Sequence, residues 1–317
     1  MARMILKGIF PALTTPFGPD GDLYLEGLRQ NIARYNQTAL AGYVVNGSTG
    51  ESVLLRWGEV ERVWEAAKEA AAPGKFVIAG TGAESTVETI EHTNRAAALG
   101  YDAALVRTPH YFKPQMTADT LSEYYLRVAD AARIPILLYS VPIFTQLTLK
   151  AEVVAHVAAH PNIIGMKDSS GDLAGIAEII AAAPRDFQLL VGGVSVLHES
   201  LQKGATGAVL AVACVFPDLC VEAYEASLAG NSSRAQAAQR KLTAAANLFG
   251  PRHGIAGLKY AMDLVGFYGG PARPPLLPLN STAKAEIDEM LASVAPGIVP
   301  GIAQEAVAAA NTGPVKA

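Results

Sequence analysis

The chain has 317 residues, of which half are hydrophobic and 17% are charged. This length and composition are typical of one large enzyme-sized domain with an appendage, or of two ordinary domains, and they exclude a disordered or fibrous chain. The net charge is −4, with acidic and basic residues interspersed and no basic run. We therefore expect no nucleic-acid partner. We also expect no membrane partner, because no apolar stretch approaches the roughly 20 residues of a membrane span.

The N-terminal segment Met1–Phe10 carries two positive charges but no sustained apolar core. We expect no signal peptide and a cytoplasmic location. The two cysteines, Cys214 and Cys220, lie in a stretch rich in Ala and Val, and we interpret them as small buried hydrophobic side chains in a reducing compartment. Cysteine and histidine do not cluster with metal-ligand spacing, so we expect no metal site. The sequence indicates no organic cofactor either.

Short apolar runs alternate with longer amphipathic stretches along most of the chain. The runs are continuously apolar, as in strands buried on both faces of a parallel sheet. Eight units and no Gly-rich dinucleotide-binding fingerprint favour an α/β fold of the closed (β/α)8 TIM-barrel type over an open doubly wound sheet. In chain order, the strand and helix expected in each unit are Gly8–Thr15 and Tyr24–Thr38, Gly42–Gly47 and Trp57–Ala72, Lys75–Gly82 and Ser85–Leu99, Tyr101–Thr108 and Ala118–Ala132, Ile134–Ser140 and Lys150–Ala159, Ile163–Ser169 and Leu173–Ala183, Phe187–Gly193 and Val196–Lys203, and Gly207–Ala213 and Asp218–Leu228.

After about residue 229 the pattern becomes entirely helical. We expect a barrel domain over residues 1–229, a C-terminal helical domain over 230–295 and a flexible tail, rich in Gly, Pro and Ala, over 296–317. The helices expected in the second domain are Ser232–Phe249, Leu258–Leu264 and Thr282–Ser293.

The chemistry of such a barrel is placed at the C-terminal ends of its strands, and Lys167 is the most informative residue there. Lys167 interrupts an apolar strand, and burial disfavours the charged form of an amine, which leaves a nucleophile available. The alternative is an internal ion pair with Asp168 or Glu51. Tyr139 ends the preceding strand and could pass protons beside Lys167, or it could be a buried tyrosine with a satisfied hydroxyl.

The loop Gly47–Glu51 supplies hydroxyl and backbone N–H groups near a helix start. Such a loop can hold a carboxylate, although most loops of this composition are only turns. His110 also follows a strand end, but no carboxylate partner is evident for it, and we expect it to pack in a loop.

These residues together resemble the dihydrodipicolinate synthase/N-acetylneuraminate lyase superfamily over about residues 6–295. The resemblance depends on several motifs occurring in the right order at the right strand ends. They are Pro11–Phe17 (PALTTPF), the Gly47–Glu51 loop, Tyr111 within TPHYFKP, Tyr139 within YSVP, Lys167 within GMKDSSGD, and Gly266–Leu279 (GFYGGPARPPLLPL).

The resemblance implies a class I aldolase or lyase that is a homotetramer, built as a dimer of dimers. Lys167 would form a Schiff base with a 2-oxo acid such as pyruvate, and the resulting enamine would react with an aldehyde. Tyr139 would relay protons with Ser48 and with Tyr111, the latter reaching across a dimer interface. Ser48 and Thr49 would bind the pyruvate carboxylate, and the Val209 carbonyl would line the site.

Two departures from the family pattern bear on the substrate. Ser140 and Phe144 occupy positions where dihydrodipicolinate synthases typically carry Asn and the Arg that binds the second substrate's carboxylate. The absence of this guanidinium argues against a role in lysine biosynthesis, although an Arg elsewhere in the chain could substitute for it. The YSVP, GMKDSSGD and FYGGPARPPL motifs together look closer to those of 4-hydroxy-2-oxoglutarate aldolases, and we take such an aldolase as the first hypothesis. The alternatives are a 4-hydroxy-tetrahydrodipicolinate (dihydrodipicolinate) synthase, a sugar-acid lyase or dehydratase, and a non-catalytic homologue that binds 2-oxo acids.

Overall fold

Eight parallel strands form a single sheet in the order β1-β8-β7-β6-β5-β4-β3-β2 in the computed structural model, which describes residues 4–294. The sheet closes between β1 and β2, where Ala12 and Val44 form a parallel bridge and Leu13 N–H donates to the Val44 carbonyl at 2.9 Å. The predicted (β/α)8 barrel is therefore confirmed. The strands are β1 Gly8–Pro11, β2 Gly42–Val45, β3 Phe76–Gly80, β4 Ala103–Arg107, β5 Ile136–Ser140, β6 Ile163–Asp168, β7 Gln188–Val191 and β8 Gly207–Leu210.

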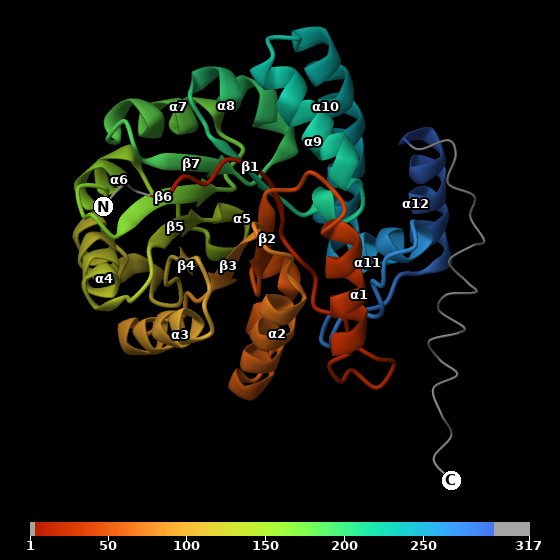
Figure 1. Ribbon diagram of the computed structural model, residues 1–317, viewed down its shortest axis with the longest axis horizontal. Helices are drawn as coiled ribbons and strands as arrows, with labels where there is room; N and C mark the ends of the chain where they lie inside the picture. The colour runs from red at the N-terminus through yellow and green to blue at the C-terminus, as the bar shows by residue number, and fades with distance from the viewer. Residues whose placement is uncertain (1–3, 295–317) are drawn as a thin grey trace.

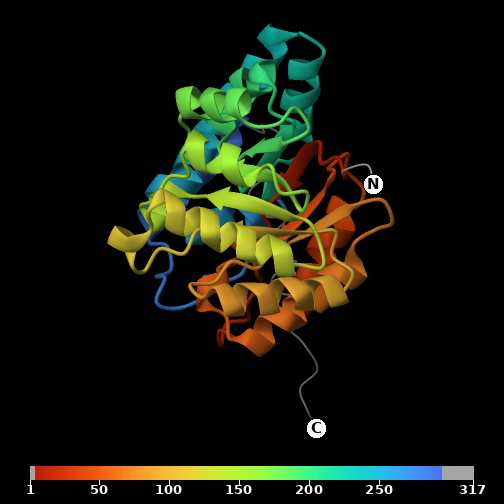
Figure 2. The same ribbon diagram turned by 90° about the vertical axis from the view of Figure 1, so that its left-hand side faces the viewer.

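Helices surround the strands as a ring in Figure 1 and flank them in the view turned by 90° (Figure 2). Every expected helix is present, and most of the ends lie within three residues of the predicted positions. The largest difference is α11, which begins at Gly254, because a five-residue π-helical segment leads directly into it. The helices are α1 Leu25–Tyr35, α2 Trp57–Ala70, α3 Thr86–Ala98, α4 Ala118–Ala131, α5 Pro142–Thr145, α6 Ala151–Val157, α7 Leu173–Ala182, α8 Leu197–Lys203, α9 Pro217–Leu228, α10 Ser232–Asn247, α11 Gly254–Leu264 and α12 Ser281–Val294.

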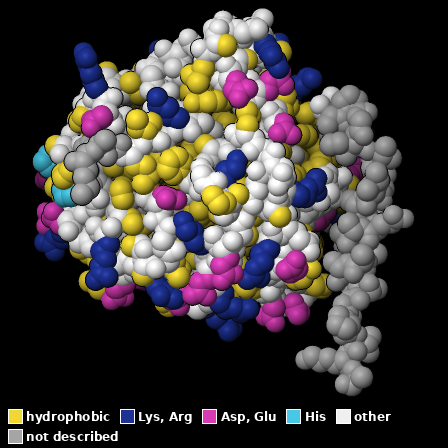
Figure 3. Space-filling model, in the orientation of Figure 1, with side chains coloured by type: hydrophobic (Ala, Val, Ile, Leu, Met, Phe, Trp, Pro, Cys, Tyr) yellow, Lys and Arg dark blue, Asp and Glu magenta, His cyan; other side chains and the backbone are white. Residues whose placement is uncertain are grey.

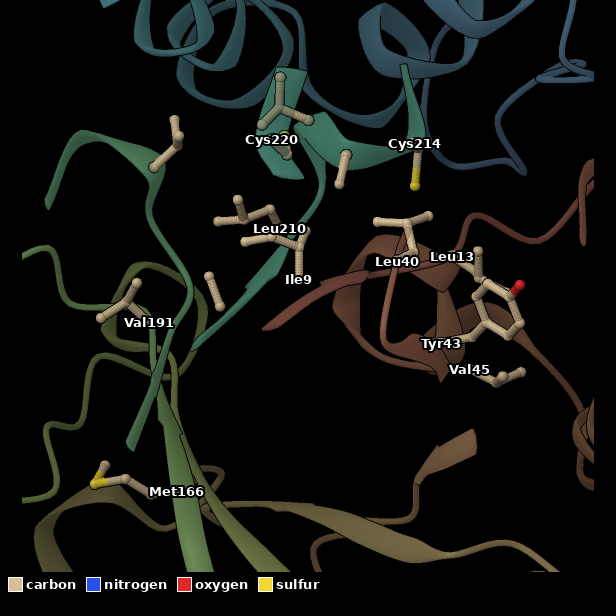
Figure 4. Close-up of a cluster of buried hydrophobic side chains, with 14 of the residues drawn as sticks. Ile9, Leu13, Leu40, Tyr43, Val45, Met166, Val191, Leu210, Cys214 and Cys220 are labelled. Atoms are coloured by element: carbon tan, nitrogen blue, oxygen red, sulfur yellow. The ribbon is translucent and has the colours of Figure 1, made fainter. Parts of the chain in front are cut away.

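The hydrophobic core has two layers because successive strand residues point to opposite faces of the sheet. On β4, Ala103 and Leu105 belong to the cluster inside the barrel, whereas Ala104 and Val106 belong to the cluster between strands and helices. Part of the outer cluster is drawn in Figure 4, where labelled side chains from β1, β2, β6, β7 and β8 appear together with Cys220 of α9. This alternation determines which strand-end side chains reach the barrel mouth.

The C-terminal helices pack onto this framework. α10 packs against α8 and α9, and α12 packs against α10 and α11. Leu242, Leu258 and Ile287 are buried in the same hydrophobic cluster that covers the outside of the barrel. The boundary at residues 229 and 230 stays a prediction, and the expected tail lies outside the described residues.

Cys214 and Cys220 are both buried and unbridged, as interpreted from the sequence, and burial raises the pKa of the Cys214 thiol to about 12. Among residues 4–294, no helix is long and apolar enough to cross a membrane, and no cluster of His, Cys, Asp and Glu could hold a metal ion. Figure 3 shows acidic and basic side chains interspersed along the lower edge of one face. The cytoplasmic location stays a prediction.

Candidate active site

Lys167 lies on β6 with only 4% of its surface exposed. It is the direct neighbour of Tyr139 on β5, and its Nζ donates a hydrogen bond to the Tyr139 hydroxyl at 3.3 Å and lies 4.4 Å from the ring centroid. Within residues 4–294 no carboxylate forms an ion pair with this amine. The proposed ion pair with Asp168 or Glu51 is therefore wrong, because Asp168 accepts hydrogen bonds from Ser170 and Glu51 pairs with a different lysine.

Tyr139 connects Lys167 to the loop after β2. Its hydroxyl lies 3.4 Å from Ser48 Oγ, and the side chain is 5% exposed. Burial alone would raise the pKa of this phenol. The positive charge of Lys167 and hydrogen bonds with Ser48, Lys167 and Ser169 outweigh burial and lower the pKa below its usual value. A phenol with a lowered pKa releases and regains a proton more easily near neutral pH.

The loop after β2 is a 3-10 turn over Ser48–Gly50, with a left-handed residue on each side. Asn46 has φ 56° and Glu51 has φ 55°. Asn tolerates this region, but Glu does so less readily, so contacts must stabilise Glu51 in this conformation. Thr15 Oγ1 donates to the Gly50 carbonyl at 2.6 Å, which ties the loop to the end of β1. Thr49 is half-buried beside Ser48 in the same turn.

Contacts from the C-terminal region stabilise Glu51, and sequence reasoning missed them. Lys259 on α11 is fully buried and its Nζ lies 2.5 Å from Glu51 Oε1, while Arg273 N–H donates to Glu51 Oε2 at 2.8 Å. The Arg273 guanidinium forms two hydrogen bonds with Glu59 on α2, at 2.6 and 2.7 Å. The Gly266–Leu279 motif therefore braces the loop that carries Ser48.

A cavity of about 460 Å³ opens at the barrel mouth and is lined by Ser48, Tyr139 and Tyr111, among others. Tyr111 is 75% exposed, and within residues 4–294 it makes no hydrogen bond with Tyr139. The site of one chain thus brings together Lys167, Tyr139 and Ser48 but leaves Tyr111 at the rim. Val209 on β8 is buried inside the barrel.

His110 does have a carboxylate partner, contrary to expectation. Its Nδ1 lies 2.7 Å from Glu84 Oε1, and Glu84 also accepts the backbone N–H groups of His110 and Tyr111 at 2.8 Å. Glu84 lies 26 residues before His110 in the chain, which is why local spacing gave no sign of the pair. These contacts fix the loop after β4.

A buried amine beside a phenol and a hydroxyl, at the mouth of a (β/α)8 barrel, defines an enzyme suited to carbonyl chemistry. Comparison with known proteins agrees. Residues 5–294 match the model of the dihydrodipicolinate synthetase family, and the chain belongs to that family. It is accordingly an enzyme of the aldolase (lyase) type.

Relatives of known name are similar over nearly their full length. A 4-hydroxy-tetrahydrodipicolinate synthase from Methanothrix thermoacetophila is 37% identical over 288 residues, which is 90% of this chain and 96% of the relative. A dihydrodipicolinate synthase from Bacillus anthracis superposes with a TM-score of 0.88 at 26% identity, covering 92% and 99% of the two chains. A chloride-inhibited dihydrodipicolinate synthase from Acinetobacter baumannii, solved with pyruvate, superposes with a TM-score of 0.88 at 29% identity. The superposition covers 93% of this chain and 100% of that one.

These findings confirm the superfamily inferred from the motifs. They favour the alternative hypothesis, a 4-hydroxy-tetrahydrodipicolinate synthase, over the first hypothesis of a 4-hydroxy-2-oxoglutarate aldolase.

Proposed function

We propose that this enzyme forms a Schiff base between Lys167 and pyruvate and joins the resulting enamine to an aldehyde, in a reversible reaction. The observation that carries the proposal is the Lys167 amine, 4% exposed, 3.3 Å from a phenol and free of any carboxylate within residues 4–294. An ion-paired lysine would be engaged by its carboxylate, whereas this amine has only a hydroxyl partner and is available to bond with a carbonyl carbon.

The proposed chemistry uses the groups around Lys167 in sequence. The neutral amine attacks the C2 carbonyl of pyruvate, and water leaves once the carbinolamine oxygen has been protonated through Tyr139. The iminium then withdraws electrons from C3, so that removal of a C3 proton gives an enamine. Attack of C3 on the aldehyde forms the new C–C bond, and the aldehyde oxygen takes up a proton. Hydrolysis of the iminium, or attack on it by an amine of the product, frees Lys167.

Pyruvate would be oriented by the loop after β2. We assign its carboxylate to the Ser48 hydroxyl and to the N–H groups of Ser48 and Thr49, and we assign the Val209 carbonyl to the wall of the site. The position of the Ser48 hydroxyl, 3.4 Å from that of Tyr139, supports a relay that joins the bound carboxylate end to the reacting carbon. No cofactor takes part in this scheme.

Tyr111 would complete the relay in a neighbouring copy of the chain. Its exposure of 75% and that of the adjacent Phe112 (66%) support an interface there, and we propose the homo-oligomer, a dimer of dimers, that the resemblance implies. Mixing two inactive variants, Lys167→Ala and Tyr111→Phe, tests this. If Tyr111 acts across the interface, mixed dimers regain one complete site and part of the activity. No recovery upon subunit exchange would contradict it.

The aldehyde partner follows from the names of the relatives. 4-hydroxy-tetrahydrodipicolinate is a cyclic seven-carbon dicarboxylate, and removing the three carbons of pyruvate leaves aspartate semialdehyde, a four-carbon aldehyde with an amine and a carboxylate. We propose this aldehyde first. Glyoxylate, which would give 4-hydroxy-2-oxoglutarate, is the second candidate, favoured by Phe144 in place of the arginine typical of the synthases. Product analysis by mass spectrometry with each aldehyde separates the two.

Borohydride trapping tests the Schiff base directly. The protein is incubated with pyruvate, reduced with sodium borohydride, and analysed by intact mass and peptide mapping. We expect one pyruvate-sized adduct on the peptide that contains Lys167. The adduct should be absent in Lys167→Ala and unchanged in Lys203→Ala, a control lysine exposed on α8. Trapping on another lysine, or on none, would refute the proposal.

A further inference from the structure

Arg107 is a charged residue in the barrel mouth to which the proposed chemistry gives no role. It is the last residue of β4, and its side chain is 15% exposed. Ala103 and Leu105 on the same strand face the barrel interior, so the alternation of the strand turns Arg107 inward as well. Arg107 also lines the cavity that contains Ser48 and Tyr139.

Strand register places Arg107 level with the proposed reacting groups. Arg107 is the direct neighbour of Tyr139, which is the direct neighbour of Lys167. Three adjacent strands thus carry Arg, Tyr and Lys in register, at the last residue of β4 and at the residue before the last of β5 and β6. Arg107 and Lys167 lie two strands apart, so their Cα atoms are separated by about 10 Å. A short 2-oxo acid bonded to Lys167 can span the gap between two long side chains that both point inward from this distance.

The Arg107 guanidinium is poorly satisfied by the protein. Its Nε is buried and has no hydrogen-bond partner within residues 4–294. The nearest carboxylate is Glu84, 3.5 Å from Nη2, which is longer than a hydrogen bond. Glu84 is already engaged by the imidazole of His110 and by two backbone N–H groups. A buried guanidinium N–H without an acceptor is costly unless a ligand supplies one.

The backbone around Arg107 is adapted to this position. A Cβ on Gly82 would lie 2.4 Å from Arg107 N and 3.0 Å from its Cα, so only glycine lets the loop after β3 pack so closely against the end of β4. Within residues 4–294, Arg107 is also the only lysine or arginine among the residues that line the cavity. An anionic group on a ligand therefore has one fixed cation to meet there.

We propose that Arg107 determines specificity by binding a carboxylate on the aldehyde substrate, which rests on the function proposed above. The guanidinium would form paired hydrogen bonds with this carboxylate and orient the aldehyde carbon toward the enamine on Lys167. Arg107 thereby supplies, from β4, the positive charge that Phe144 does not supply after β5. The substrate class is a short aldehyde that carries a carboxylate.

The test compares aldehydes with and without a carboxylate. With pyruvate saturating, kcat/KM is measured for aspartate semialdehyde, glyoxylate and the uncharged acetaldehyde, with products identified by mass spectrometry. We expect the wild-type enzyme to prefer at least one of the carboxylate-bearing aldehydes. In Arg107→Ala that preference over acetaldehyde should fall roughly 30- to 100-fold, as expected for the loss of charge-assisted hydrogen bonds. Arg127→Ala, a control arginine exposed on α4, should keep it.

Several results would overturn this proposal. One is that Arg107→Ala keeps the preference for carboxylate-bearing aldehydes over acetaldehyde. Another is that the wild-type enzyme prefers neither aspartate semialdehyde nor glyoxylate to acetaldehyde. A third is Glu84→Gln reproducing the loss of preference seen in Arg107→Ala, because Arg107 would then serve only as the counter-ion of Glu84. If Arg107→Ala does not fold, Arg107→Lys serves instead and should retain only part of the preference. Borohydride trapping keeps the two proposals distinguishable. If the wild type forms the pyruvate adduct but Arg107→Ala keeps the preference for carboxylate-bearing aldehydes, only the role of Arg107 is refuted. If the wild type forms no adduct, the Schiff base is refuted.

Discussion

Removing the buried Lys259 should destabilise both the fold and the site. Lys259 is fully buried, and its partner Glu51 is 2% exposed, so Lys259→Met leaves a carboxylate charge in the interior with no counter-ion. Breaking a buried ion pair from one side costs roughly 3–5 kcal/mol. The N–H of Arg273 still donates to Glu51, so we expect about 3 kcal/mol, near the lower end of that range. For a chain of this size that corresponds to a fall in Tm of roughly 6 °C.

Neutralising the partner carboxylate, in Glu51→Gln, should cost less stability. In Glu51→Gln, Lys259 keeps its hydrogen bond to the Pro271 carbonyl at 2.9 Å, and it can also become neutral, because burial lowers the pKa of this amine. The double variant Glu51→Gln/Lys259→Met leaves no buried charge at this position. It should therefore be more stable than Lys259→Met alone, by about 2 kcal/mol.

Thermal unfolding followed by circular dichroism measures these differences, with borohydride trapping as a readout of the loop that carries Ser48. The exposed pair Glu123–Arg127 on α4 is the control, since Arg127→Ala should leave Tm nearly unchanged. The reasoning fails if Lys259→Met costs less than about 1 kcal/mol, which is the value for a surface pair. It also fails if the double variant loses the sum of the two single effects, because the residues would then be independent.

Three further predictions concern other groups. Tyr139→Phe should slow formation of the pyruvate adduct by roughly 10²-fold, measured by timed borohydride quenching. Hydrogen bonds from Arg273 lower the pKa of Glu59 from 4.5 to about 2, so this stabilisation is present above pH 4.5 and is lost as pH falls toward 2. The free energy of unfolding, measured with urea, should therefore fall by about 2 kcal/mol less between pH 5.5 and pH 3 in Glu59→Gln than in the wild type. Cys214 and Cys220, both fully buried, should react with a thiol reagent only after unfolding.

Each of these has a clear contrary result. Adduct formation at the wild-type rate in Tyr139→Phe would remove Tyr139 from the relay. Equal acid sensitivity in Glu59→Gln would mean that other carboxylates account for the loss of stability. Rapid labelling of the native thiols would mean that the segment around Cys214 opens readily.

The barrel could be predicted because each unit carries its own signal. Continuous apolar strands, amphipathic helices and turn residues are local features, and they fixed the strands to within a few residues. Lys167 and Tyr139 could be found for the same reason, since a polar residue that ends an apolar strand is visible in the sequence. Arg107 carries the same signal, because it follows the apolar run of YDAALVRT. The alternation of β4 identifies it as inward-facing.

The partners of these residues could not be predicted, because they come from distant segments. Glu51, one of the two carboxylates expected as an alternative partner of Lys167, pairs instead with Lys259, which is brought in by the packing of α11. The pairing of Arg273 with Glu59 spans 214 residues of sequence. Local spacing contains no information about such contacts, which arise only when the C-terminal helices pack on the barrel.

Three cationic side chains are held in or near the mouth of this barrel, and what faces each one determines its role. Lys259 faces a carboxylate, so its charge is neutralised and it stabilises the loop after β2. Lys167 faces a phenol and no carboxylate within residues 4–294, so its amine is placed to bond with a carbonyl carbon. The Nε of Arg107 has no partner within residues 4–294, so an anionic substrate is the group that would complete its hydrogen bonds. Burial alone marks all three as unusual, and only the identity of the neighbour separates a structural cation from a nucleophile and from a binding group.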